Sequence, residues 1–254
     1  MGLHESDQQR RPTIDPTATI PTRRALFRLF LHERHDPEPF YRAVAARTFA
    51  DFGLPLDGRS VLDLGSGDAV NAGQLAARGA DVVALDRRVE RAALAAAVDV
   101  RAVAGDAQQL PFRDQSFDGV FCSNLLEHLP DHRSALDEIA RVLTPGGWAW
   151  VSWTNWLSPV GGHRISPLHY LGPRIGSRVH SAVFGEFTGP HVYDGLWPLH
   201  IGTVLRDLRD HPTLRVRAAV PRYYPRQRWL LRVPGVREVA TWNCALTLER
   251  TGAV

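Results

Sequence analysis

Short apolar runs alternate with stretches of helical periodicity between residues 60 and 153 of this 254-residue chain. The apolar runs predict strands at residues 60–64, 81–85, 98–103, 117–122 and 148–153. The intervening stretches predict helices at residues 69–78, 89–97 and 131–143. Because the strands are apolar at consecutive positions, both of their faces should be buried. The pattern therefore predicts an α/β fold in which helices cover both faces of a parallel sheet.

The region before this alternation is less regular. Residues 1–22 are polar and contain several prolines, which predicts a flexible N-terminal lead. Residues 23–52 have helical spacing that Pro37 and Pro39 interrupt, so we expect two N-terminal helices there. The length suits a single domain over residues 23–254.

The alternation lapses after the fifth strand and resumes near the C-terminus. Residues 154–200 are rich in glycine, proline and histidine, and they predict an irregular insertion on the substrate side. A helix is expected near residues 201–210, and strands are expected near 214–220 and 240–248. Between these last two strands, residues 221–239 form an excursion rich in arginine and aromatic residues.

The composition excludes several kinds of chemistry. All 30 basic residues are arginine, which rules out a lysine Schiff base, a pyridoxal phosphate anchor and a P-loop lysine. The net charge of +3 is too slight to indicate nucleic acid as a partner without a concentrated basic patch. Cys122 and Cys244 lie too far apart in sequence to suggest a metal site or a redox pair. His163, His169 and His191 lack a recognised ligand spacing, so no metal is predicted.

The sequence V-L-D-L-G-S-G-D at residues 61–68 joins the first strand to a glycine turn before a helix. Gly65 and Gly67, with Ser66 between them, let the backbone approach a ligand and adopt positive φ. Ligands of such sheets bind beyond the carboxyl ends of the strands. There the carboxylate of Asp63 would attract a positively charged amino group and repel a pyrophosphate. The turn therefore favours a cofactor with an amino-acid moiety over a dinucleotide.

Acidic and amide side chains follow the next strands at the same edge. Asp86, with Arg87 beside it, follows the second strand and suits both ribose hydroxyls, which NAD and S-adenosylmethionine share. Asp106 follows the third strand and can accept from an adenine amino group, while the backbone of Ala107 serves the ring edge. Asn124 ends the fourth strand, where it is expected to face the methionine end of the cofactor.

Together these motifs resemble class I S-adenosylmethionine-dependent methyltransferases from about residue 55 to about residue 155. The resemblance rests on the D-x-G-x-G turn, Asp86, G-D-A-Q-Q-L-P-F at 105–112, C-S-N-L-L-E-H-L at 122–129 and R-V-L-T-P-G-G at 141–147. It is nearest to the small-molecule branch that includes the ubiquinone and menaquinone methyltransferases. The sequence departs from the family at Asp68 and Ala69, where a third glycine is commoner, so the fine shape of the turn is open.

The resemblance implies a fold and a cofactor. The fold is a Rossmann-like, doubly wound seven-stranded sheet whose last strand is antiparallel. The cofactor is S-adenosylmethionine, held by Asp63, Gly65, Gly67, Asp86, Asp106 and Asn124.

The reaction so implied is an in-line displacement in which the enzyme mainly positions two partners. A general base is needed only if the acceptor is a poorly acidic hydroxyl. His163, preceded by Gly161 and Gly162 in the insertion, is the first candidate for that base. His128 is the second candidate, although the Glu127–His128 pair often serves structure at such a bend. We expect O-methylation of a hydroxyl on a lipid-linked, glycan or secondary-metabolite acceptor.

The excursion at residues 221–239 carries five arginines against one glutamate, with interleaved tyrosine, tryptophan and leucine. This composition suits peripheral contact with an anionic membrane surface or with an anionic or lipid-linked substrate. Single-stranded nucleic acid is a rival partner. The remaining interpretation is a structural one, in which the segment packs on the edge of the sheet.

Two other functions remain open from the sequence. A nicotinamide-dependent oxidoreductase could use the same sheet, although the missing third glycine and the G-D-A-Q-Q-L-P-F segment argue against it. A cofactor-binding subunit without activity is the second alternative. The N-terminus lacks the layout of a signal peptide, and no apolar run approaches the roughly 18 residues of a membrane span, so a cytoplasmic location is expected.

Overall fold

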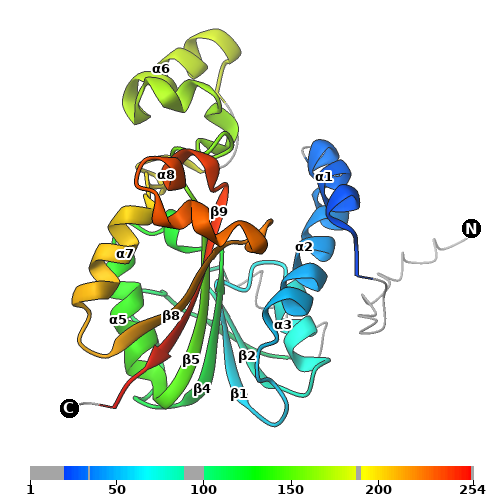
Figure 1. Cartoon of the computed structure of the whole chain (residues 1–254), viewed down its shortest axis with the longest axis vertical. Coiled ribbons are helices and arrows are strands. Elements are labelled where there is room, and N and C mark those ends of the chain that lie inside the picture. Colours follow the sequence, from blue (N-terminus) through cyan, green and yellow to red (C-terminus); the bar gives the residue numbers. More distant parts are fainter. Residues whose placement is uncertain (1–19, 34, 89–99, 187–189, 253–254) are drawn as a thin grey trace, which may run out of the picture.

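The computed structural model describes residues 20–33, 35–88, 100–186 and 190–252 (Figure 1). The helix predicted over 89–97 lies outside these ranges, as does all but the end of the predicted lead over 1–22.

The described residues form a seven-stranded sheet with the order β3-β2-β1-β4-β5-β9-β8. Its strands are β1 Ser60–Leu64, β2 Asp81–Asp86, β3 Arg101–Ala104, β4 Phe117–Ser123, β5 Leu143–Thr154, β8 Leu214–Pro221 and β9 Asn243–Arg250. The pairs among the first five strands are parallel, whereas β9 runs antiparallel to both β5 and β8. The predicted doubly wound sheet with an antiparallel last strand is therefore confirmed.

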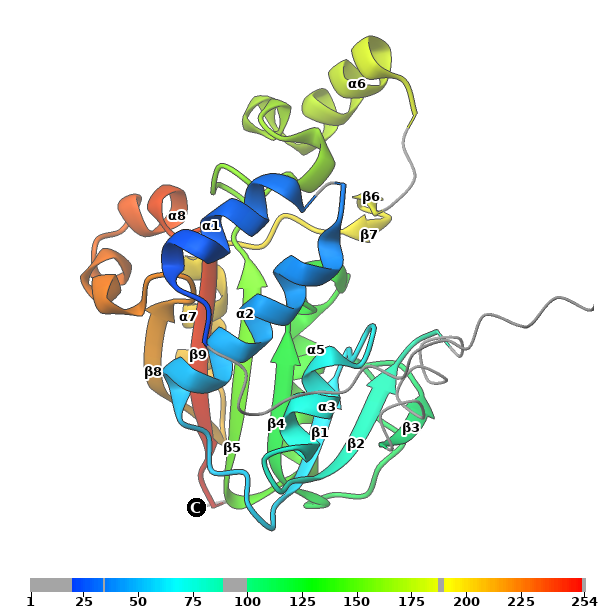
Figure 2. The same cartoon turned by 90° about the vertical axis from the view of Figure 1, so that its right-hand side faces the viewer.

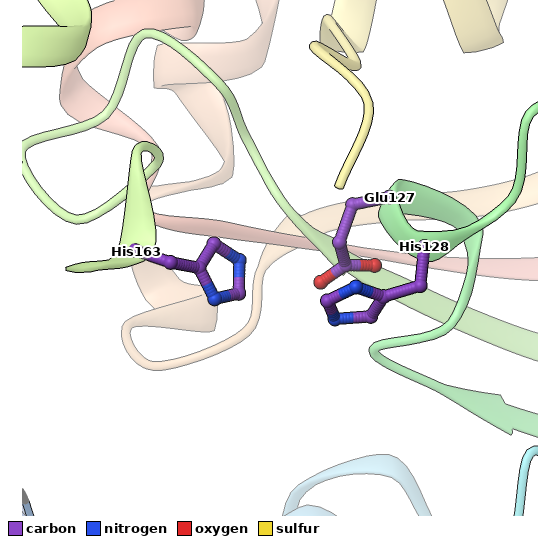
Figure 3. A group of neighbouring side chains, drawn as sticks. All are labelled: Glu127, His128 and His163. Carbon is purple, nitrogen blue, oxygen red and sulfur yellow. The ribbon is translucent and has the colours of Figure 1, made fainter. Parts of the chain in front are cut away.

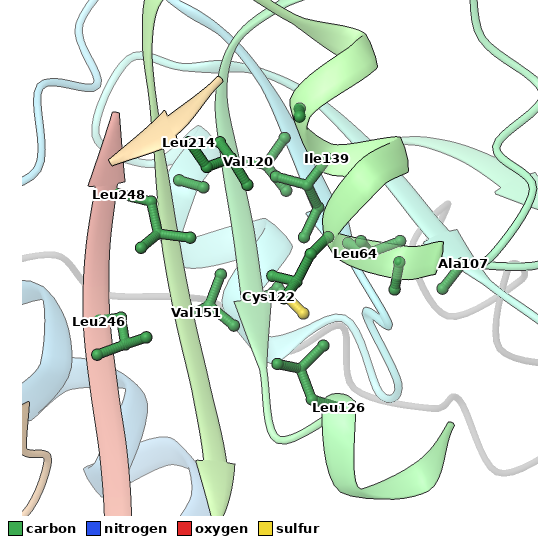
Figure 4. Packing of buried hydrophobic residues seen from close by; sticks show 14 of the residues in the cluster. Leu64, Ala107, Val120, Cys122, Leu126, Ile139, Val151, Leu214, Leu246 and Leu248 are labelled. Atoms are coloured by element: carbon green, nitrogen blue, oxygen red, sulfur yellow. The ribbon is translucent and has the colours of Figure 1, made fainter. Parts of the chain in front are cut away.

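Helices cover both faces of this sheet (Figures 1 and 2). One face carries α2 Pro37–Phe52 and α3 Val70–Ala76, and the other carries α5 His132–Val142 and α7 Ile201–Asp210. Alternate residues of each strand feed opposite cores, because successive side chains point to opposite faces. Val120 and Val151 pack under α5 and α7 (Figure 4). Phe121 and Trp150 stack on the other side, with ring centroids 4.6 Å apart.

The two predicted N-terminal helices are present as α1 Arg23–His32 and α2. Thr22 caps α1 by accepting a hydrogen bond from the amide of Ala25 at 3.2 Å. Pro37 begins α2, a position that tolerates its missing N–H. The rings of Phe30 and Phe40 join the two helices, with centroids 5.7 Å apart.

The structure corrects three boundaries. The final strand runs over residues 243–250 rather than 240–248, because the short helix α8 Val236–Ala240 occupies the expected start. The third strand runs over 101–104, one residue beyond the expected end; Val100 precedes it, and residues 98 and 99 of the expected range 98–103 lie outside the described residues. The insertion over 154–200 is more ordered than predicted, since it contains the helix α6 Pro173–Phe184, the short strands β6 His191–Val192 and β7 Gly195–Leu196, and the 3₁₀ turns η2 His163–Ile165 and η3 Leu168–Leu171.

The excursion over 221–239 folds into a 3₁₀ segment, η4 Pro225–Arg232, followed by α8. It lies beside β9 above the carboxyl edge of the sheet, toward the end of the molecule from which α6 projects (Figures 1 and 2). Among the described residues, no helix combines the length and the apolarity that a membrane crossing requires.

Candidate functional site

The turn after β1 is shaped as the glycines predict. Gly65 and Gly67 have positive φ values of 73° and 52°. A Cβ atom on Gly65 would lie 3.0 Å from the side chain of Leu125, in the loop after β4. The amide of Ser66 donates to the carbonyl of Leu85 at 3.0 Å, which fixes the turn against the end of β2. The backbone in this turn is therefore open to close approach by a ligand.

Asp63 is a buried carboxyl at the end of β1. Its side chain is 1% exposed, and its Oδ2 has no hydrogen-bond partner. Burial raises the pKa of Asp63 to about 7, and the charge of Asp86 adds to this rise, while a bond from the backbone of Ala72 opposes it. A positively charged group at this edge would pair with the carboxylate and offset the cost of burying it.

Asp86 connects the ends of β1 and β2. Its Oδ2 accepts a hydrogen bond from the amide of Gly67 at 3.0 Å, and its Oδ1 accepts from the amide of Arg88 at 3.1 Å. The carboxylate is half-buried beside the glycine turn, and the neighbouring Arg87 is exposed. The two loops predicted to share one ligand are thus in direct contact.

Asp106 and Ala107 form a turn after β3. The Asp106 carboxylate is exposed and accepts from the amide of Gln108 at 2.9 Å, while Ala107 is buried in the core. Asp106 thus keeps acceptor capacity at the surface of this edge, which an adenine amino group requires.

Asn124 is held in a left-handed conformation, with a φ of 54°, directly after β4. Its side-chain oxygen accepts three hydrogen bonds: from Ser152 Oγ at 3.2 Å, from Arg222 Nη1 at 3.1 Å and from Asn243 Nδ2 at 2.9 Å. These donors come from β5, from the residue after β8 and from β9. The predicted position of Asn124 at the edge of the sheet is thus fixed by long-range contacts.

Arg222 is the residue that the sequence analysis missed. It directly follows β8 and is 4% exposed. Its guanidinium carbon lies 4.9 Å from the ring centroid of Trp150. Besides Asn124 it donates to Ser123 Oγ at 3.0 Å and to Thr48 Oγ1 at 3.1 Å. Burial lowers its pKa, since these hydrogen-bond partners are all neutral. No local pattern distinguishes this arginine from the other four of the excursion.

The two predicted histidines meet at one place. His128 belongs to the 3₁₀ turn η1 Leu126–His128, and its ring lies 5.4 Å from that of His163, centroid to centroid. Glu127 completes the group, and one ligand atom from each of the three residues lies within 4.8 Å of the others (Figure 3). We refer to Glu127, His128 and His163 as the Glu-His-His cluster.

Each member of the cluster carries an available lone pair. Glu127 is 1% exposed; its Oε1 accepts from the amide of Thr154 at 2.8 Å, while its Oε2 has no partner. Burial raises the pKa of Glu127, although His128 opposes this rise. Burial also lowers the pKa of His163 to about 4, so this imidazole is neutral at pH 7, and its buried Nε2 has no partner.

The glycines before His163 serve packing. A Cβ atom on Gly161 would lie 2.0 Å from the carbonyl oxygen of Trp156, and one on Gly162 would lie 2.5 Å from the Cβ of His169. His169 itself is buried and bonds to the carbonyl of Ser158 at 3.0 Å. It therefore stays outside the cluster, as does His191 on β6.

The residues at this edge fit S-adenosylmethionine. The orphaned acceptor of Asp63 suits a cationic amino group, and the positive φ values of Gly65 and Gly67 shape a turn without side chains beside it. Asp86 and Asp106 offer carboxylates at the next two strand ends. The residues predicted for the cofactor follow neighbouring strands at this edge, whereas the sequence analysis gave Glu127 and Arg222 no functional role.

Comparison with known proteins identifies similar methyltransferases. Residues 62–151 match the family described as a methyltransferase domain. An uncharacterized methyltransferase of Mycobacterium sp. (strain JLS) is 34% identical over 253 residues, covering 91% of this chain and 96% of the relative. One of Mycobacterium leprae (strain TN) is 34% identical over 245 residues, covering 91% and 90%.

Solved structures share the fold. An S-adenosylmethionine dependent methyltransferase from Mesorhizobium loti has a TM-score of 0.59 at 19% identity, covering 81% of this chain and 98% of that one. A methyltransferase from Thermotoga maritima described as SAM-dependent has a TM-score of 0.57 at 15% identity, covering 89% and 99%. At these low sequence identities, the similarity shows a shared fold and nothing about function.

Proposed function

The chain belongs to the methyltransferase family, and we propose that it transfers the methyl group of S-adenosylmethionine to a hydroxyl oxygen of a small-molecule acceptor. The acceptors that we propose are lipid-linked, glycan or secondary-metabolite alcohols. The combined resemblance of the motifs between residues 55 and 155 to the small-molecule branch supports this class of acceptor.

We assign the roles on the cofactor side from the resemblance of the motifs and from their places at the strand ends. Asp63 would pair with the amino group, and the turn of Gly65, Ser66 and Gly67 would lie against the amino-acid chain. Asp86 and Arg87 would serve the ribose, and Asp106 with the backbone of Ala107 would serve the adenine. Asn124 would face the methionine end. When bound there, S-adenosylmethionine supplies a methyl carbon activated by its positive sulfur.

The Glu-His-His cluster is the observation that carries the choice of a hydroxyl. An alcohol must lose its proton as the new bond forms, which an amine or a thiolate acceptor does not require in the same way. Glu127 Oε2 and His163 Nε2 are buried acceptors without partners. Burial raises the pKa of Glu127 and lowers the pKa of His163, so Glu127 is the stronger base of the two and would accept this proton before it passes to solvent. His128 and His163, predicted singly as bases, are here one activating group together with Glu127.

The transfer balances without a further reagent. A lone pair of the acceptor oxygen forms the new C–O bond, the C–S bond breaks, and its electron pair stays on sulfur. The hydroxyl proton leaves to solvent. The chain contributes position and electrostatics, because an in-line displacement is limited mainly by alignment of the two partners.

We also propose that the excursion contacts an anionic membrane surface, where a lipid-linked acceptor would be found. Trp229 is 55% exposed, and Val236 and Val239 are 41% and 51% exposed. Arg226, Arg228 and Arg232 are exposed beside them. Apolar side chains interleaved with arginines suit the boundary between headgroups and acyl chains. The helix α6, which carries the exposed Ile175, Val183 and Phe184, lies toward the same end of the molecule (Figures 1 and 2).

The test uses S-adenosylmethionine with a ¹³C-labelled methyl group and a panel of hydroxylated acceptors. Nuclear magnetic resonance distinguishes a methyl on oxygen from one on nitrogen, carbon or sulfur. A labelled methyl ether is the expected product. Labelled product only on nitrogen or carbon would overturn the choice of hydroxyl. Binding of S-adenosylhomocysteine without transfer to any acceptor would favour an inactive partner subunit instead.

A further inference from the structure

We propose that Glu127, His128 and His163 form a binding site for one divalent transition-metal ion at the carboxyl edge of the sheet. The three candidate ligand atoms lie within 4.8 Å of one another. Glu127 and His128 lie on η1, and His163 is the first residue of η2. Their side chains point toward one another (Figure 3). Two imidazole nitrogens and one carboxylate oxygen are a ligand set that proteins use for catalytic zinc and for non-haem iron.

Unpaired buried atoms point to a missing partner. Glu127 Oε2 and His163 Nε2 are both buried and both lack a hydrogen bond. A buried polar atom without a partner destabilises the folded protein, and more so when it is charged. A cation between them would satisfy both atoms at once, and it would compensate a carboxylate on a side chain that is 1% exposed.

Neighbouring groups orient the ligand atoms. The Nδ1 of His128 lies 2.6 Å from the carbonyl oxygen of Gly195, to which it donates, so Nε2 keeps its lone pair. The amide of Thr154 occupies Oε1 of Glu127 and leaves Oε2 available. His163 is fixed in a left-handed conformation with a φ of 50°. Metal-binding histidines and carboxylates generally have this second layer of support.

The ligand set selects the kind of ion. Calcium and magnesium prefer oxygen ligands, whereas imidazole nitrogen suits zinc, iron, nickel and copper. Three protein ligands leave at least one coordination position open, as in catalytic zinc sites. The site therefore suits a zinc-like ion that can still bind one more oxygen.

The role of the ion rests on the proposed transfer to a hydroxyl, whereas the site itself rests on the geometry of the three side chains. Glu127 and His128 lie three and four residues after Asn124, at the edge where the methyl group would be presented. A divalent cation lowers the pKa of a bound hydroxyl, so its proton leaves to solvent near neutral pH. His163 would then hold the ion rather than take the proton.

The test begins with the full chain, freed of any histidine tag, treated with a chelator and dialysed. Zn²⁺ is titrated by calorimetry, and Co²⁺ is titrated while visible absorption is recorded. We expect one strong site for Zn²⁺ in the wild type. We also expect Co²⁺ bands of four- or five-coordinate geometry, a measurement that needs no variant.

Variants assign the site to the cluster. His163→Gln and Glu127→Gln should each weaken Zn²⁺ binding by about 100-fold or more. The matched control is His35→Gln, since His35 is exposed in the turn between α1 and α2 and should keep wild-type affinity. Retained binding of S-adenosylhomocysteine shows that each variant is folded. Equal Zn²⁺ affinity in wild type and His163→Gln would overturn the site.

The two proposals fail separately. A wild-type chain that methylates a hydroxyl and does not bind Zn²⁺ overturns the metal site and leaves the proposed function standing. A chain that binds Zn²⁺ through the cluster while methylating only nitrogen or carbon supports the metal site and overturns the choice of hydroxyl.

Discussion

The guanidinium of Arg222 donates a hydrogen bond of 3.1 Å to the side-chain oxygen of Asn124, a residue 98 positions earlier in the chain. Ser152 and Asn243 donate to the same oxygen, so β5, β9 and the residue after β8 all hold the end of β4. Because its hydrogen-bond partners are neutral oxygens, the buried cation is held by dipoles rather than by an ion pair.

Arg222→Met should weaken binding of S-adenosylhomocysteine by about 10-fold. The variant removes one donor to Asn124, and a hydrogen bond of about 1.4 kcal/mol corresponds to one factor of ten. Calorimetric titration below the melting temperature measures the effect. Arg228→Met, at an exposed position of η4, is the control and should bind normally. Unchanged affinity in Arg222→Met would mean that Ser152 and Asn243 suffice to position Asn124.

We predict that Asp63 makes binding of the cofactor product depend on pH. Its pKa of about 7 lies above the unfolded value of about 3.9, so the free protein loses stability as pH rises between these values. A cationic amino group pairs only with the carboxylate, so affinity for S-adenosylhomocysteine should fall as pH drops from 8 to 6. Calorimetry across this range tests the prediction.

The variant Asp63→Asn separates the two effects, because it keeps the shape and removes the charge. It should raise the melting temperature of the free protein at pH 8, weaken ligand binding and flatten the pH dependence. The control is Asp210→Asn, at an exposed position that ends α7. A pH dependence that survives in Asp63→Asn would assign it to another group.

Gly65→Ala tests the glycine turn. Alanine at a φ of 73° costs about 1–2 kcal/mol of stability, and its Cβ would lie 3.0 Å from the side chain of Leu125, which must shift beside Asn124. Gly146→Ala is a matched control: its φ is 77°, and its Cβ would meet nothing within 4 Å. Both should lower the melting temperature, but only Gly65→Ala should weaken ligand binding. Equal affinities would place the ligand elsewhere.

Asp86→Ala should weaken the cofactor without unfolding the chain. It removes the acceptor that ties Gly67 to the end of β2 at 3.0 Å, together with the carboxylate proposed to meet the ribose. A charged hydrogen bond is worth about 1.5–3 kcal/mol, which corresponds to about 10- to 150-fold in affinity. The control is Asp81→Ala at the opposite end of the same strand. Wild-type affinity in Asp86→Ala would reduce Asp86 to a structural role.

The membrane proposal predicts binding to anionic vesicles. Arg228→Ser with Arg232→Ser should weaken sedimentation with phosphatidylserine vesicles by about 30-fold, at about 1 kcal/mol for each arginine near the surface. The control is Arg206→Ser with Arg209→Ser, which removes the same charge from exposed positions of α7. An equal loss in both double variants would indicate general charge attraction rather than a surface on the excursion.

The succession of strands and helices along the chain could be predicted from the sequence because the patterns that specify it are local. Consecutive apolar residues at 60–64 and 117–122 specify strands buried on both faces, and Pro37 begins the second N-terminal helix after the first has ended at His32. The turn at Gly65 and Gly67 has its predicted positive φ values because glycine alone adopts them freely. Parallel strands then bring their carboxyl ends to one edge, which places Asp63 and Asp86 together.

Other boundaries depended on packing. The stretch from 240 onward has the composition of a strand, yet residues 236–240 form α8. The insertion contains α6, whose exposed Val183 and Phe184 give little of the apolar burial that helical periodicity normally reports. Helices with few core contacts leave a weak pattern in sequence, so the irregular composition of 154–200 concealed this one.

The tertiary structure alone decided which polar groups meet. The amphipathic composition of the excursion is typical of a surface segment, and Trp229 and Arg228 are indeed exposed. Arg222 is different because β9 inserts antiparallel between β5 and β8, which carries the end of β8 to the same edge as β4. Likewise Glu127 and His163 converge only when the loop after β5 folds back over η1. Hydrophobic periodicity specifies which face of an element is buried. Which buried polar side chains contact one another depends on long-range packing, and no local pattern encodes it.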